Sequence, residues 1–114
     1  MARSKIPKPL ERRLLIERKL GETQALQIAE AYLAEGRAIE AVDFLRLGHA
    51  TDRLRELRRQ AVESGDAFLF RAAVAATGEE PEASEWKNLA DAADAAGKEG
   101  YAAEARRQAG RGED

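Results

Sequence analysis

The side chains that could do acid–base or nucleophilic chemistry are few and scattered in this sequence. Its one histidine, His49, directly follows Gly48, and the chain has no cysteine to complete a Cys–His nucleophile or a soft-metal site. The serines Ser4, Ser64 and Ser84 have no base close to them in the sequence. We therefore interpret His49 as a solvent-exposed residue of a connector between helices.

Carboxylates form the densest cluster of potential ligands, at Glu79, Glu80, Glu82 and Glu85. Such a cluster could bind a cation, but acidic residues are also favoured in the first turn of a helix by its dipole. The EF-hand pattern is missing, and so are the glycine-rich phosphate-binding motifs. Asp91 and Asp94, three residues apart, are more typical of a solvated helix face than of an acid–base pair. We therefore expect no enzyme, no metal site and no cofactor.

The composition is that of a single helical domain in the cytoplasm. A chain of 114 residues fits one domain, and with 44% hydrophobic but only 5% aromatic residues its core has to be built from Ala and Leu. The absence of cysteine fits a reducing compartment. The first 20 residues carry charges throughout, which predicts no signal peptide. No apolar stretch approaches the ~20 residues of a membrane-spanning helix, so we expect no membrane partner.

Regularly spaced glycines predict where the helices end. They fall at positions 21, 36, 48, 65, 78, 97 and 110. Glycine just past the end of a helix commonly adopts the left-handed conformation of a C-cap. Because the intervals alternate between long and short, we predict three helical hairpins over about 22–48, 50–78 and 80–110.

The predicted hairpins are flanked by shorter elements. A short helix over 9–20 precedes them, since Pro9 can occupy a first helical turn, and residues 1–8 form a basic flexible arm. Thr51 and Asp66 are suited to be N-caps, and Pro81 to the first turn of the next helix. Residues 111–114 form a polar tail that we expect to fray.

The segment between Gly65 and Gly78 is the expected centre of the core. Its sequence, DAFLFRAAVAAT, is apolar nearly all round, with Arg71 as the one interior charge, and it contains Phe68 and Phe70, two of the three phenylalanines. A helix that is apolar on all sides has to be enclosed by other elements. We therefore predict that the rest of the chain packs around this helix.

Two of the hairpins carry a recognisable pattern of small and large residues. The first places Ala25, Ile28, Ala29 and Tyr32 on one helix face, and Ala38, Ala41, Val42 and Leu45 on the next. The third places Trp86, Leu89 and Ala90 in its first helix, with Ala102 and Ala109 in its second. This pattern resembles the tetratricopeptide (TPR) repeat family, whose repeat is a 34-residue helical hairpin.

The resemblance implies an all-α fold with three antiparallel hairpins stacked as a short right-handed solenoid. Trp86 would then pack inside its own hairpin. In the second hairpin, Leu54, Leu57 and Ala61 keep the packing face, but Arg58 and Phe70 stand where the family has small residues. Equivalent positions are 29 and 32 residues apart, so a less regular stack similar to HEAT repeats would fit the same glycines.

In the TPR family, the first helices of the hairpins line a concave groove that binds a peptide or a helix. Carried over to this sequence, the partner-binding positions are Leu26, Glu30, Leu33, Arg55, Arg59, Val62, Lys87, Asp91 and Asp94. Periodicity itself places Arg55 and Arg59 opposite the packing face. The subgroup that binds terminal carboxylates uses an asparagine, which these positions lack, so that specificity is not implied. An ordinary solvated helix face would show the same charges.

Three functional hypotheses follow. The first is a non-catalytic adaptor or scaffold that binds another protein through the groove or through its ends, where exposed apolar surface favours a partner or self-association. The second is a structural or accessory subunit of a larger complex. The third is nucleic-acid binding through the basic arm and the arginines of segment 53–59. Residues 1–20 hold seven Lys and Arg against two Glu. The pI near 5.6 disfavours nucleic acid for the whole chain.

Overall fold

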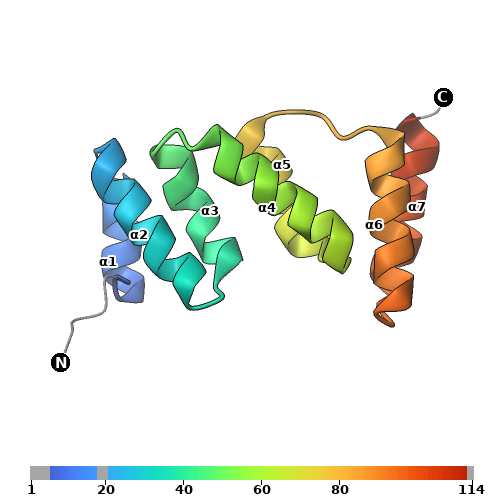
Figure 1. Cartoon of the computed structure of the whole chain (residues 1–114), viewed down its shortest axis with the longest axis horizontal. Coiled ribbons are helices and arrows are strands. Elements are labelled where there is room, and N and C mark those ends of the chain that lie inside the picture. Colours follow the sequence, from blue (N-terminus) through green and yellow to red (C-terminus); the bar gives the residue numbers. More distant parts are fainter. Residues whose placement is uncertain (1–5, 18–20, 113–114) are drawn as a thin grey trace. The chain divides into compact units, whose positions relative to one another are not determined.

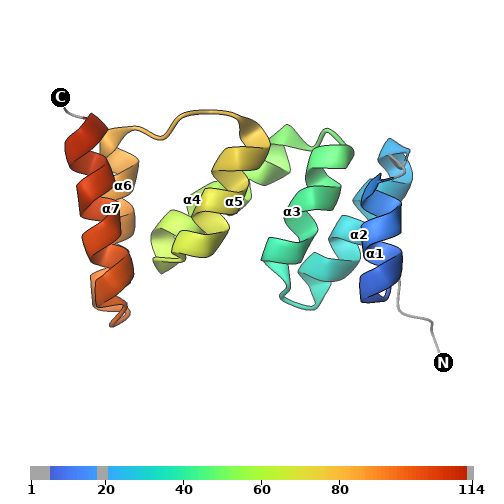
Figure 2. The ribbon, with the colours of Figure 1, turned by 180° about the vertical axis from the view of Figure 1, so that it is seen from behind.

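The computed structural model describes residues 6–17 and 21–112 (Figures 1 and 2). This part of the chain is all-α and contains no strand. Its helices are α1 (Pro9–Glu17), α2 (Glu22–Ala34), α3 (Ala38–Leu47), α4 (Thr51–Ser64), α5 (Ala67–Thr77), α6 (Ala83–Ala95) and α7 (Glu99–Gly112). No helix within it has the length and apolar character needed to cross a membrane. The predicted fold class is therefore confirmed at the level of an all-α protein.

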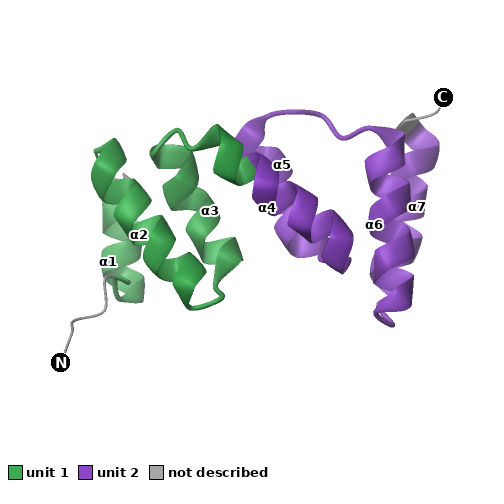
Figure 3. Ribbon diagram, in the orientation of Figure 1, with its two compact units in different colours: residues 1–54 green, residues 55–114 purple. Residues whose placement is uncertain are grey.

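The chain divides into two compact units, residues 1–54 and residues 55–114, with the boundary inside α4 (Figure 3). In the first unit α2 packs along α3, and α1 contacts α3. In the second unit α6 packs along α7, and the two lie side by side in both views (Figures 1 and 2).

The same turn follows α2, α4 and α6, at the three positions where the sequence predicts a hairpin turn. Its glycine is left-handed in every case, with φ of 72° at Gly36, 71° at Gly65 and 76° at Gly97. The next residue then donates its N–H to the carbonyl five residues back. These bonds are Arg37 to Tyr32 (2.9 Å), Asp66 to Ala61 (2.9 Å) and Lys98 to Ala93 (2.8 Å). The predicted glycine C-caps are therefore confirmed at all three hairpin turns.

Gly78 is a left-handed C-cap of α5 as well, with φ of 69°, as predicted, whereas Gly48 and Gly110 do not end helices in this way. Gly48 has φ of −84°, and it is His49 that takes the left-handed conformation, with φ of 55°. A Cβ on Gly48 would lie 2.6 Å from the Leu26 side chain, so the glycine allows α2 and α3 to approach closely. Gly21 precedes α2 as its N-cap, and Gly110 lies within α7.

The predicted helix ends are partly corrected. Asp66 is confirmed as an N-cap, since its Oδ1 accepts the Leu69 N–H at 3.0 Å. Thr51 is instead the first helical residue of α4. Pro81 lies outside α6, which begins after Glu82 because the Glu85 side chain accepts the Glu82 N–H at 3.2 Å.

The outer limits of the predicted elements are also adjusted. α1 begins at Pro9 as predicted, while residues 18–20 of the expected helix and residues 1–5 of the expected arm lie outside the described residues. At the other end, α7 continues to Gly112, so residues 111 and 112 are helical where a fraying tail was expected.

The core of the first unit is an aromatic stack covered by α1. Tyr32 and Phe44, both fully buried, stack with ring centroids 5.7 Å apart. The Arg12 guanidinium of α1 lies 5.7 and 5.4 Å from the two rings and donates to the Glu40 carbonyl (2.9 Å) and to Asp43 Oδ2 (3.1 Å). A cation over two aromatic faces, with two hydrogen bonds from one guanidinium nitrogen, anchors α1 to the hairpin, although the buried Arg12 Nε has no hydrogen-bond partner among the described residues.

The core of the second unit is centred on Phe70, which is fully buried. Its ring lies 5.6 Å from the Arg58 guanidinium and meets the Trp86 ring edge-on at 4.9 Å. The aromatic partner of Trp86 is therefore in α5, a contact outside the α6–α7 segment that the sequence did not predict. α6 and α7, which pack on each other, bury Leu89 and alanines at positions 90, 93, 102, 105 and 109.

α5 is not enclosed on all sides, and that prediction is wrong. Leu69, Phe70 and Ala73 are buried, but Phe68 is 61% exposed and Arg71 and Ala75 are exposed with it. Positions 68, 71 and 75 follow the spacing of one helix face. Alanine fills much of the rest of the helix, and its small side chain fits a buried or an exposed position equally well.

Candidate protein-binding surfaces

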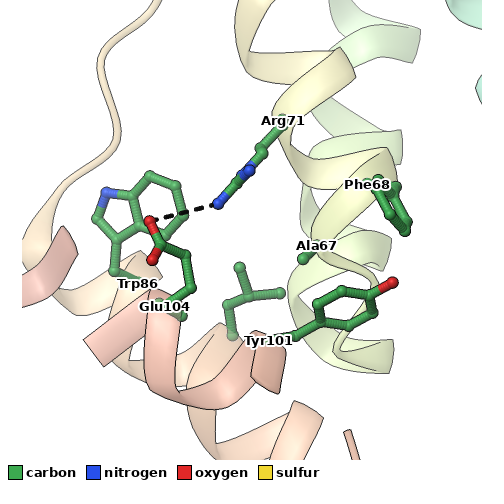
Figure 4. Close-up of a pocket in the computed structure, with 8 residues that line it drawn as sticks. Ala67, Phe68, Arg71, Trp86, Tyr101 and Glu104 are labelled. Carbon is green, nitrogen blue, oxygen red and sulfur yellow. Dashed lines mark ion pairs between the residues drawn. The ribbon is translucent and has the colours of Figure 1, made fainter. Parts of the chain in front are cut away.

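An apolar cavity lined by aromatic side chains lies between α5, α6 and α7 of the second unit (Figure 4). Its volume is about 330 Å³. We call it the aromatic hollow, and its lining residues include Ala67, Phe68, Arg71, Trp86, Leu89, Tyr101 and Glu104. Phe68 and Tyr101 pack edge to face with ring centroids 5.3 Å apart. The sequence analysis missed this site, although exposed Phe68 shares a helix face with Arg71.

An incompletely satisfied arginine lies at the hollow. The Arg71 guanidinium points toward Glu104 (Figure 4), and the two form an ion pair at 3.6 Å, which is too long for a hydrogen bond. Glu104 already accepts two hydrogen bonds from its own helix, α7. Its Oε1 accepts from Gln108 Nε2 and its Oε2 from Arg107 Nε, both at 3.0 Å. The bonds from Gln108 and then Arg107 hold the pKa of Glu104 below its ordinary value. The Arg71 guanidinium therefore has N–H donors with which it can bind a further acceptor.

A second hollow of about 540 Å³ lies in the same unit, between the C-terminal part of α4, the segment 79–82 and the start of α6. We call it the arginine hollow. Arg58 forms its buried wall, donating to both carboxylate oxygens of Glu85 (2.7 and 2.8 Å) and to the Glu79 carbonyl (2.8 Å). Arg58 also lies over the Phe70 ring, with its guanidinium carbon 5.6 Å from the ring centroid.

The Arg58–Glu85 pair makes stability depend on pH. Its hydrogen bonds lower the pKa of Glu85 below the ordinary value of 4.5. A carboxyl whose pKa is lowered by folding stabilises the folded chain above its unfolded pKa, and this stabilisation is lost as the pH falls through the folded pKa. The Glu85 contribution is therefore present at neutral pH and disappears on acidification below 4.5.

We expect Arg58→Met to lower the free energy of unfolding at pH 7 by about 1–3 kcal/mol, because Glu85 loses its partner while the packing on Phe70 is kept. The variant should also lose less further stability than the wild type between pH 7 and acid. Urea midpoints measured across this range test both effects. Arg59→Met, at an exposed position of the same helix, is the control and should change little. Equal acid sensitivity of Arg58→Met and wild type would contradict the assignment.

Two predicted groove residues of α4 line the arginine hollow and are held by carboxylates. Arg55 Nε donates to Glu79 at 3.0 Å, and Arg59 pairs with Glu56 and Glu63 on its own helix. Both arginines are exposed, as periodicity predicts, and Val62 lies beside them in the lining.

In the first unit, Leu26 and Glu30 line a shallow hollow on α2 with Thr23, Gln27 and Ala31. Glu30 accepts hydrogen bonds from Arg53 at 2.8 and 3.0 Å. Leu33 is half-buried and lies outside this lining.

The predicted groove residues of α6 form a third local group. Asp91 and Asp94 both pair with Arg106 of α7, Asp91 at 3.7 Å, and Lys87 is exposed on the same helix. The predicted residues thus gather around α2, α4 and α6 separately. That they form one groove stays a prediction.

The arginines of segment 53–59 do not form an open cationic patch. Arg58 is 7% exposed, which removes it as a candidate phosphate contact. Arg53, Arg55 and Arg59 each face glutamate. The sequence hypothesis had treated the four as one basic surface, because a linear sequence does not show which carboxylates pair with each arginine, whether from the same helix, as for Arg59, or from a distant segment, as for Arg53 and Arg55.

His49 is exposed, as predicted, and its Nδ1 lies 2.6 Å from Glu22 Oε1. Throughout residues 6–17 and 21–112, no three His, Asp or Glu side chains converge in a way that could hold a metal ion. In the acidic segment, Glu79 and Glu85 instead face Arg55 and Arg58.

Together, the described helices define an all-α chain, and its second unit has an apolar cavity lined by aromatic side chains. No family model matches the sequence, and no curated protein or solved structure matches it either. Function therefore has to be argued from the surfaces themselves.

Proposed function

We propose that this chain is a non-catalytic helical-repeat adaptor that binds another protein. The observation that carries the proposal is the aromatic surface of the second unit, where Phe68 is 61% exposed, packs edge to face with Tyr101 and lines the aromatic hollow. Burial of an aromatic side chain is a large source of binding energy. Trp, Tyr and Arg are also the residues most frequent among interface hot spots.

The repeat character of the proposal rests on a shared register. Counted from the left-handed glycine of each hairpin, the residue four positions before it is buried in all three, as Tyr32, Ala61 and Ala93. The residue five positions after it is fully buried too, as Ala41, Phe70 and Ala102. This register supports a TPR-like arrangement, with the hairpins stacked as a right-handed solenoid.

Stacking of the second hairpin on the third has further support within the second unit. A Cβ on Gly65 would lie 2.5 Å from the backbone N of Ala93 in α6. The turn of one hairpin thus packs directly on the first helix of the next.

Exposed apolar side chains in the first unit favour the same class of function. Leu10 is 71% exposed and Leu14 41%, both on α1, and Ile39 of α3 is 48% exposed. Single exposed apolar residues are common on monomers, so this surface ranks below the aromatic hollow as a binding site.

The test is affinity capture with the full chain after nuclease treatment. We expect a protein to be recovered at fixed stoichiometry, with binding that survives an increase from about 50 to 200 mM salt. A second copy of the chain, detected with two different tags, would identify the partner as itself. Recovery of nucleic acid with steep salt dependence, or of no protein at all, would contradict the proposal.

Two variants then locate the surface by calorimetry with the recovered partner. If the groove is used, Arg55→Ala together with Arg59→Ala should weaken binding without changing helicity. If the basic arm is used, deletion of residues 1–8 should do so instead. Undiminished affinity in both would leave the aromatic hollow or an end of the stack as the contact.

A further inference from the structure

We propose that the aromatic hollow receives one bulky apolar side chain from a protein segment that carries an acidic residue beside it, and that Arg71 binds this acid. The proposal rests on the protein-binding function above and adds the chemistry of the partner. It uses neither the predicted groove nor the basic arm.

The shape and walls of the hollow define the anchor. Its volume of about 330 Å³ is at the lower end of the range for ligand pockets. Trp86, Leu89 and Tyr101 supply apolar walls from α6 and α7, and Ala67 and Phe68 supply them from α5. A side chain such as Phe or Leu, inserted here, exchanges water for aromatic contacts on several sides.

The charge at the hollow defines the neighbour of the anchor. Across the described helices, the interaction found for the Arg71 guanidinium is the 3.6 Å ion pair, while Glu104 has its shorter bonds to Arg107 and Gln108. A guanidinium has five N–H donors and pairs with a carboxylate through two of them. Arg107 is also well exposed, so two arginines face one glutamate here. A partner acid is therefore favoured and a partner lysine disfavoured.

The exposed Phe68 ring, which packs on the half-buried Tyr101, favours a protein segment as the ligand rather than a free small acid. The Phe68 side chain stays 61% exposed even though it contributes to the lining. A small molecule of the volume of the hollow would leave that outer surface in water. A helix or an extended peptide can insert one side chain and cover Phe68 and Tyr101 with its neighbours.

The experiment has two stages, and the first is selection from a random peptide library against the full chain. We expect enriched peptides to place Phe, Leu, Ile or Trp next to Asp or Glu. When the Arg71→Glu variant is the target of the selection, the enriched peptides should carry Lys or Arg in place of Asp or Glu. Arg46→Glu, at an exposed position of α3, is the control and should select the wild-type pattern. No enrichment, or the same peptides for Arg71→Glu as for wild type, would overturn the proposal.

The second stage uses Trp86, the one tryptophan of the chain, as a fluorescent reporter within the hollow. A selected peptide without Trp should change its emission. Its affinity should fall at least about tenfold in Arg71→Gln and in Phe68→Ala, as is common for hot-spot residues. Thermal midpoints and helicity of the variants show whether each is folded.

Three outcomes separate the competing explanations. Free 3-phenylpropionate that binds as tightly as the peptide would show a small-molecule site and overturn the choice of partner. Selected peptides that bind without any effect of Arg71→Gln or Phe68→Ala would leave the protein-binding function standing while this inference fails. Loss of binding in the Arg55→Ala, Arg59→Ala variant alone would assign the peptide to the arginine hollow.

Discussion

Replacing Gly65 with alanine should lower the free energy of unfolding by about 3 kcal/mol or more. Gly65 is left-handed, with φ of 71°, which costs a residue with a Cβ about 1–2 kcal/mol. The new Cβ would also lie 2.5 Å from the Ala93 N and 2.7 Å from its Cα, both in the backbone of α6. Backbone atoms move only with their helix, and overpacking of this kind costs about 1–3 kcal/mol more. Urea unfolding at neutral pH measures the change.

Gly36→Ala is the matched control for this prediction. Gly36 closes the first hairpin with nearly the same φ, 72°, but a Cβ there would meet nothing within 4 Å. This variant should therefore lose only the conformational part, about 1–2 kcal/mol. The difference between the two variants isolates the contact of the second hairpin with α6. Equal losses would mean that this contact does not form.

The second large effect is expected for Phe70→Ala, at about 3–5 kcal/mol from lost burial and the cavity that remains. Phe70 is fully buried between Arg58 and Trp86, so its removal also deprives both of their ring contacts. Natural domains have only about 5–15 kcal/mol of stability, so this loss is a large share. Guanidinium or urea midpoints followed by circular dichroism, with Trp86 emission as a second probe, measure it.

Phe68→Ala provides an internal comparison two residues away on the same helix. Because Phe68 is 61% exposed, its truncation should cost far less stability than that of Phe70. The pair of variants therefore separates a core phenylalanine from a surface one that the proposed function uses. A loss for Phe68→Ala as large as that for Phe70→Ala would show that α5 is enclosed after all, and the aromatic hollow would not be open to a partner.

The sequence predicted the hairpins because their signals are local. A left-handed turn requires glycine at one position, so Gly36, Gly65 and Gly97 marked the hairpin turns correctly. Apolar residues spaced by one helical turn likewise predicted the buried faces, including Tyr32 and Leu45. Neither inference needs knowledge of distant residues.

The errors arose where the decisive contact comes from another helix. Gly48 is a glycine because the Leu26 side chain of α2 lies against it, and the left-handed residue is His49. Arg58 appeared to be a surface charge, yet Glu85 and the Phe70 ring, both distant in the sequence, bury it. A helical wheel shows which residues share a face, but not which faces other helices cover.

The aromatic hollow could not be predicted for the same reason. It combines Phe68 and Arg71 from α5 with Trp86 from α6 and Tyr101 from α7, and no interval in the sequence connects these helices. Only the spacing of residues 68, 71 and 75 along one exposed helix face could have indicated this hollow. The high alanine content of α5 made that spacing hard to recognise.

Photo-crosslinking from position 68 tests the central claim, that this surface binds another protein, most directly. A benzophenone amino acid would replace Phe68 in the full chain and, as the control, Gln60 at an exposed position of α4. Illumination in the native cell, with mass analysis of the adducts, reports what lies against each position. We predict one discrete protein adduct from position 68, reduced by Arg71→Gln, and no equivalent adduct from position 60. No adduct, or the same adducts from both positions, would contradict the account.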